Sequence, residues 1–139
     1  MKRASFVLAM LALVAFCGLA FADIHMVADP SQPAAMGAVS LGHDDNGNTV
    51  MSVHVQHLAD PAALTPPQQS YAVWIQEPGK EPQFIGNLAV DKNLKGELRA
   101  PVPARAFDVF ITAETNAHPD TPSSMKVLHA TVQATATGQ

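Results

Sequence analysis

Cysteine is almost absent from this chain of 139 residues, since the only one, Cys17, lies in an apolar stretch near the start. Residues 23–139 therefore have no thiol that could form a disulfide, hold zinc or act as a nucleophile. Basic residues are also few, with eight Lys and Arg against twelve Asp and Glu and a formal net charge of −4. An acidic chain without a basic stripe argues against a nucleic-acid partner.

The N-terminus has the pattern of a signal peptide. Lys2 and Arg3 give a positive start, an uncharged apolar run follows, and Ala20-Phe21-Ala22 places small residues at positions −3 and −1 of a cleavage site. We expect a signal peptide over residues 1–22, cleaved before Asp23. A retained anchor is the alternative, but the apolar run is shorter than the roughly 20 residues that a spanning helix needs. The pattern predicts a periplasmic or secreted protein with no membrane span after cleavage.

Short β-strands are the elements that the pattern after the leader favours. Proline and glycine interrupt the chain about every 8 to 15 residues, and the segments between them are rich in β-branched and aromatic residues. No window has a sustained helical period with caps, so we expect no substantial helix. The expected strands cover residues 35–42, 49–57, 71–76, 84–90, 97–100, 107–114 and 126–133.

About seven such strands predict an all-β fold, an immunoglobulin-like antiparallel β-sandwich that follows the signal helix. We expect one domain over residues 23–139, with an ordered core at 33–133 and a flexible tail at 134–139. Asp44-Asp45-Asn46-Gly47 predicts a hairpin turn, because Asn and Gly accept the positive φ that tight turns require. Gly86 predicts a bulge or a close approach within its strand.

Two aromatic residues and a Thr-x-Glu pair are candidate recognition residues. Tyr71 and Trp74 lie three apart on a strand and so face opposite sides of the sheet. They could grip a ligand, but we favour packing, with one ring in the core and the other over a sheet edge or loop. Thr112 and Glu114 share the face opposite Ile111, where the carboxylate could bind a cation or a partner, or pair with Lys or Arg across the sheet.

Catalytic machinery is not indicated. Acid–base chemistry at Glu114 would require a second titratable group placed against it, and the sequence names none. No Ser-His-Asp order, nucleophile elbow or phosphate-binding glycine loop occurs in the chain. We therefore expect that the protein is not an enzyme.

The histidines are candidate metal ligands. His54 and His57 form an H-x-x-H pair, but on a strand their rings face opposite sides and cannot hold one ion without a bulge. Cleavage before Asp23 would make His25 the third residue. The free amine, two backbone amides and the imidazole then form a square-planar nitrogen set of the kind that Cu(II) and Ni(II) favour. Met26 and Met36 lie nearby and offer thioethers to Cu(I).

Several short motifs occur in a fixed order: Leu64-Thr65-Pro66-Pro67, Tyr71-Ala72-Val73-Trp74, Gly86-Asn87-Leu88, Phe107 through Thr112-Ala113-Glu114, Pro119, Pro122 and Val127-Leu128. In this order they resemble the C-terminal extracytoplasmic domain of anti-sigma-K factors (the RskA family). The resemblance implies a β-sandwich outside the membrane. In that family a transmembrane helix joins this domain to a cytoplasmic domain that holds a sigma factor, and this sequence contains no such domain. Residues 115–118 also replace the family's usual glycine-rich turn.

These observations predict an exported, non-enzymatic binding or structural module. Its exposed edge strand or its loop at residues 115–124 would contact an envelope protein or another envelope ligand. The alternative is a periplasmic copper-binding protein that uses the N-terminal Asp-Ile-His set.

Overall fold

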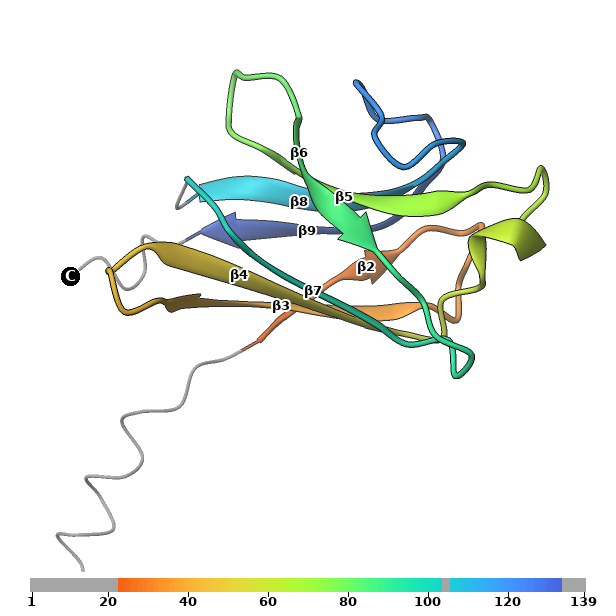
Figure 1. Ribbon diagram of the computed structural model, residues 1–139, viewed down its shortest axis with the longest axis horizontal. Helices are drawn as coiled ribbons and strands as arrows, with labels where there is room; N and C mark the ends of the chain where they lie inside the picture. The colour runs from red at the N-terminus through yellow and green to blue at the C-terminus, as the bar shows by residue number, and fades with distance from the viewer. Residues whose placement is uncertain (1–22, 104–105, 134–139) are drawn as a thin grey trace, which may run out of the picture.

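The computed structural model describes residues 23–103 and 106–133, which form two packed antiparallel sheets (Figure 1). One sheet has the strand order β1-β3-β4-β7. Its strands are β1 (Ile24–His25), β3 (Met36–His43), β4 (Thr49–Gln56) and β7 (Gly96–Pro101). The other has the order β2-β9-β8-β5-β6. Its strands are β2 (Val27–Ala28), β9 (Lys126–Gln133), β8 (Ala106–Glu114), β5 (Ser70–Gln76) and β6 (Gln83–Leu88). The predicted all-β sandwich is confirmed.

The seven longer strands coincide with the seven predicted ones to within two residues at each end. The strands β1 and β2 were not predicted, and they precede the expected start of the core at residue 33. Two residues are too few to show an alternating pattern. The chain crosses from one sheet to the other between these strands, and the side chain of Met26 at the crossing is buried in the core.

The strand order of the four-stranded sheet differs from that of an immunoglobulin domain. The hairpin partners β3 and β4 lie side by side in the four-stranded sheet. The corresponding sheet of a constant-type immunoglobulin domain pairs strands B and E, which are not neighbours in sequence. The architecture is therefore the predicted two-layer sandwich, with a different order in one sheet.

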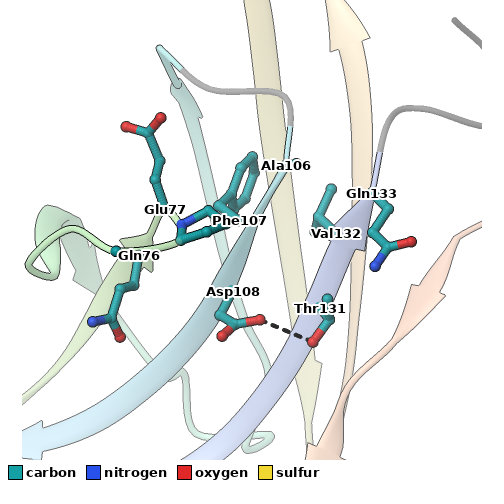
Figure 2. Close-up of a pocket in the computed structure, with 10 residues that line it drawn as sticks. Gln76, Glu77, Ala106, Phe107, Asp108, Thr131, Val132 and Gln133 are labelled. Carbon is teal, nitrogen blue, oxygen red and sulfur yellow. Dashed lines mark hydrogen bonds between the residues drawn. The ribbon is translucent and has the colours of Figure 1, made fainter.

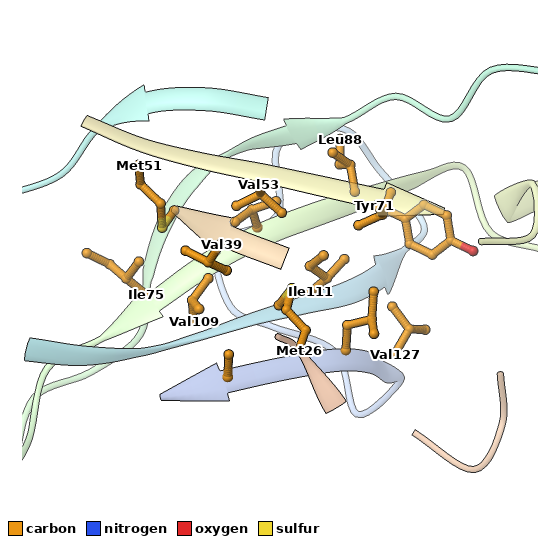
Figure 3. Close-up of a cluster of buried hydrophobic side chains, with 14 of the residues drawn as sticks. Met26, Val39, Met51, Val53, Tyr71, Ile75, Leu88, Val109, Ile111 and Val127 are labelled. Carbon is orange, nitrogen blue, oxygen red and sulfur yellow. The ribbon is translucent and has the colours of Figure 1, made fainter. Parts of the chain in front are cut away.

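Side chains alternate between core and surface along most strands, as the period of two requires. In β4, Val53 and Val55 are at most 1% exposed while His54 between them faces solvent. The core between the sheets is shown in Figure 3. Strand β8 departs from this pattern, because its residues from Val109 to Glu114 are all buried, on both faces of the sheet. The outer face of the five-stranded sheet is therefore covered near Glu114.

The predicted hairpin turn is confirmed. Asp44 Oδ1 accepts hydrogen bonds from the backbone N–H groups of Asn46 and Asn48, both at 2.9 Å, and Gly47 has a φ of +82°. This arrangement joins β3 to β4 and leaves the turn exposed.

The predicted irregularity at Gly86 is also confirmed. Val73 pairs with Gly86 and Trp74 with Phe84, so Ile85 is the extra residue of a β-bulge. A Cβ atom on Gly86 would lie 3.3 Å from the side chain of Leu98 in β7. Glycine therefore permits a close approach of the two sheets at this point.

The remaining predictions concern the proline-bearing connection, membrane-spanning helices and the two ends of the chain. The connection that holds Pro66 and Pro67 leads into β5, and it includes a short 3₁₀ turn, η2 (Pro61–Ala63). The described part of the chain contains no helix with the length and apolar character needed to cross a bilayer. The predicted signal peptide at 1–22 and the expected flexible tail at 134–139 lie outside the described residues.

Candidate functional site

Trp74 lies in a small aromatic cluster on the outer face of the five-stranded sheet. Its indole contacts Phe84 edge-on, with ring centroids 5.5 Å apart, and stacks on Phe110 at 6.5 Å. The Lys126 ammonium lies 4.6 Å from the centre of the Phe110 ring, which adds a cation–π contact. Tyr71 faces the other way, into the main core. The prediction that the two rings face opposite sides is confirmed, and both are at most 1% exposed.

A chain of hydrogen bonds links Trp74 to the end of β8. The indole Nε1–H donates to Thr112 Oγ1 at 2.9 Å, and the Thr112 hydroxyl donates to Glu114 Oε2. The same carboxylate oxygen accepts the backbone N–H of Ser123 at 2.8 Å. Thr112 is fully buried and Glu114 is 5% exposed. Each polar group is therefore paired, as burial away from water requires.

The sequence left open that Glu114 pairs with a Lys or Arg across the sheet, and the structure shows a different set of partners. It has no Lys or Arg within ion-pair distance among the described residues, and it is not an exposed group on an open sheet face. The loop at residues 115–124 folds back onto β8. Glu114 is therefore bound by the Thr112 hydroxyl and the Ser123 N–H rather than by a Lys or Arg side chain. Hydrogen bonds to an ionised acceptor are stronger than neutral ones. We call the hydrogen-bonded chain of Trp74, Thr112 and Glu114 the buried relay; it ends at Ser123, which is exposed.

The loop at residues 115–124 is fastened at both ends. At its start, the Ser70 hydroxyl donates to Asn116 O at 2.9 Å, and Asn116 Oδ1 accepts the N–H of His118 at 2.9 Å. At its end, Ser123 Oγ donates to Ala113 O at 2.7 Å and accepts the N–H of Met125 at 3.1 Å.

Between these anchors the tip of the loop is polar and exposed to solvent. Residues 115–118 and 120–121 are exposed, while Pro119 is buried and Pro122 is half-buried. Figure 1 shows the loop at one end of the sandwich, far from the turn between β3 and β4. The anchor Ser123 was missed by sequence reasoning, because nothing in a polar loop marks which hydroxyl will meet Glu114.

Tyr71 forms a second buried network on the core side. Its hydroxyl donates to Ala59 O and accepts from Gln32 Nε2 at 3.0 Å, and Gln32 Oε1 accepts the N–H of Ala59 at 3.0 Å. Burial raises the pKa of Tyr71 above its ordinary value of 10.0; the hydrogen bond from Gln32 opposes this rise, and the charge of Asp60 adds to it. The network ties two connections to β5, the one between β2 and β3 through Gln32 and the one between β4 and β5 through Ala59. Nothing in the sequence marked Gln32 for this role.

Alkaline titration is expected to unfold the protein through Tyr71. The raised pKa means that the folded state keeps the phenolic proton after the unfolded chain has lost it. Stability is therefore full below about pH 10 and falls as the pH rises through the folded pKa. Tyr71 is the only tyrosine, so phenolate absorbance reports this residue alone. Absorbance and far-UV circular dichroism should change together above pH 10.

The matched variant for this titration is Asp60→Asn, which removes a charge that raises the pKa of Tyr71. Its phenolate should form at lower pH than in the wild-type protein. A tyrosine that ionises at or below pH 10 while the strands stay intact would contradict the burial of this hydroxyl.

His54 and His57 lie at β4 of the four-stranded sheet, apart from the buried relay in the five-stranded sheet. His54 is exposed on β4 and its Nε2 lies 3.5 Å from Glu97 Oε2, while His57 follows the strand with a φ of 56°. Within residues 23–103 and 106–133, no three His, Cys, Asp or Glu side chains gather as a metal-ligand group.

His25 lies in β1, where it pairs with Ala38. The N–H of Met26 donates to Gly37 O at 2.8 Å, so by alternation the N–H of Ile24 also faces β3. An N-terminal Cu(II) set needs that amide nitrogen, and binding would have to detach β1. The N-terminal copper site stays a prediction, now with this added requirement.

A shallow groove of about 350 Å³ lies where β5 turns into β6 (Figure 2). Asp108 Oδ1 accepts a hydrogen bond from Thr131 Oγ1 at 2.9 Å on one wall, and Glu77 pairs with Lys80 at 3.7 Å. Phe107, from the family-like motifs, lines the groove but is only 2% exposed and packs in the core. Among the described residues, no Ser, Cys or His side chain lines this groove.

Comparisons with known proteins find no matching family model, no matching curated protein and no matching solved structure. The function must therefore be argued from the geometry of the chain itself.

Proposed function

We propose that this protein is an exported, non-catalytic module that binds an envelope protein through the loop at residues 115–124. The observation that carries the proposal is the buried carboxylate of Glu114, which holds the loop by the backbone of Ser123. Burying an ionised group is costly unless it is fully hydrogen-bonded. Because the buried carboxylate of Glu114 is hydrogen-bonded to the backbone of this loop, it fixes the conformation of the loop.

A fixed loop is suited to recognition. Binding through a mobile segment must first order it, whereas a loop that is already ordered avoids that loss of entropy. The exposed tip offers hydrogen-bonding side chains, among them Asn116, His118, Asp120 and Thr121. Binding residues are commonly found on loops that a rigid scaffold positions. On the β3 and β9 sides of the two sheets, β1 and β2 already lie along part of the edge.

Two further considerations support the proposal. The leader pattern at residues 1–22 and the resemblance to the extracytoplasmic domain of anti-sigma-K factors both favour a place outside the cytoplasm. In the described part of the chain, no histidine side chain accepts a hydrogen bond from a serine or threonine hydroxyl. A serine or threonine nucleophile that is activated by histidine would need such a contact.

Affinity capture with matched variants tests the proposal. The purified protein is immobilised and exposed to an envelope extract of its own source. His118→Ala combined with Asp120→Ala removes two tip side chains, and Asp45→Ala changes an exposed residue at the opposite end of the sandwich. We expect a discrete protein to be retained by the wild type and by the Asp45 variant, and to be lost with the tip variant. Equal retention by all three, or retention of nothing, would contradict the proposal.

A further inference from the structure

The outer face of the four-stranded sheet carries two histidines on either side of one alanine. His25 of β1 pairs with Ala38 of β3, and Ala38 pairs with His54 of β4. Residues directly opposite one another in neighbouring strands point to the same face of the sheet. The next residues along two of these strands, Val39 and Val53, are fully buried in the core. His25, Ala38 and His54 therefore share the solvent face, and both histidines are exposed.

The spacing across this row suits a shared ligand. Two neighbouring strand intervals place the Cα atoms of His25 and His54 roughly 10 Å apart. Only the methyl group of Ala38 stands between them, so the two imidazoles can turn toward each other above it. A ring nitrogen from each side then reaches a single ion.

A thioether lies next to the same row. Met36 is the adjacent outward-facing residue of β3, roughly 7 Å along the strand from Ala38. It is therefore a diagonal neighbour of both histidines, which is within reach of a long side chain. Its side chain is 58% exposed and is one of the most exposed large apolar residues in the described chain. Because Met36 is exposed, it contributes little to the hydrophobic core, and its sulfur is accessible to a metal ion.

We propose that His25, Met36 and His54 form a surface site for Cu(I). Two imidazoles and a thioether are soft or borderline ligands, and thioethers select Cu(I) over hard cations. Glu97 Oε2, at 3.5 Å from His54 Nε2, can accept the N–H of the second ring nitrogen and orient the imidazole. This site is distinct from the N-terminal nitrogen set, because it needs no free amine and keeps β1 paired with β3. It is also independent of the loop at residues 115–124.

Competition between the protein and a Cu(I)-selective chelator under reducing, oxygen-free conditions tests the site. The protein is purified from the periplasm of a host, and intact mass fixes its first residue. We expect one Cu(I) per chain, with each of His25→Ala, Met36→Leu and His54→Ala at least about tenfold weaker. His129→Ala, which lies in β9 of the five-stranded sheet, should bind as the wild type does.

A second variant tests the geometry of the site while all three ligand side chains are kept. Ala38→Leu keeps both histidines and the methionine but fills the space between the rings, and it should abolish binding. Ser40→Leu adds the same side chain one outward position further along β3 and should leave binding unchanged. Circular dichroism confirms that the variants are folded. Binding that survives Ala38→Leu and His54→Ala, or that depends on a free N-terminus, would overturn the proposal, as would the absence of a one-to-one complex.

Discussion

Replacing Trp74 with alanine is expected to lower the free energy of unfolding by about 3–5 kcal/mol. The indole is 1% exposed and packs between Phe84 and Phe110, so its removal leaves a cavity on the outer face of the sheet. It also removes the donor to Thr112 Oγ1. Trp74 is the only tryptophan, so urea unfolding must be followed by far-UV circular dichroism rather than by indole fluorescence.

The control for this prediction is Trp74→Phe. Phenylalanine keeps an aromatic ring in the cluster but loses the Nε1–H, so the expected loss is smaller, about 1–2 kcal/mol. The difference between the two variants separates the packing of the cluster from the hydrogen bond to Thr112. A loss below about 1 kcal/mol for the alanine variant would show that the indole is not packed as described.

The strands could be predicted from the sequence because their evidence is local. In β4 the alternation of Val53, His54 and Val55 indicates the element and its buried face together, without any knowledge of its partners. The same reasoning placed Tyr71 and Trp74 on opposite faces. It could not show that Trp74 would be as deeply buried as Tyr71, because that burial depends on Phe84 and Phe110 of the neighbouring strands β6 and β8.

The candidate sites depend on register, which the sequence does not contain. Glu114 meets Ser123 only because a loop of undefined sequence pattern folds back onto β8. Likewise, the row of His25, Ala38 and His54 joins three strands, one of which has two residues and no detectable period. Single side chains could be named as candidates beforehand, but their partners could not.

Glu114→Ala is expected to release the loop at residues 115–124 and to cost about 3 kcal/mol of stability. The substitution leaves the buried Thr112 hydroxyl without its acceptor, and it removes the acceptor that holds the N–H of Ser123, an exposed residue of the loop. Hydrogen exchange should show faster exchange of the Ser123 amide than global unfolding allows, because the loop opens while the sheets persist. Partner binding should fall by more than the lost stability predicts, since the loop must then be ordered during association.

Two variants make this result specific to the buried carboxylate. Glu114→Gln keeps the volume and one acceptor oxygen, so it should cost about 1–2 kcal/mol and protect the loop in part. Glu81→Gln removes an exposed carboxylate and should change neither stability nor exchange. If the Ser123 amide stays protected in Glu114→Ala, the carboxylate does not hold the loop. The loop would then owe its conformation to the hydroxyl of Ser123 and to Asn116, and the main support for recognition through this loop would be lost.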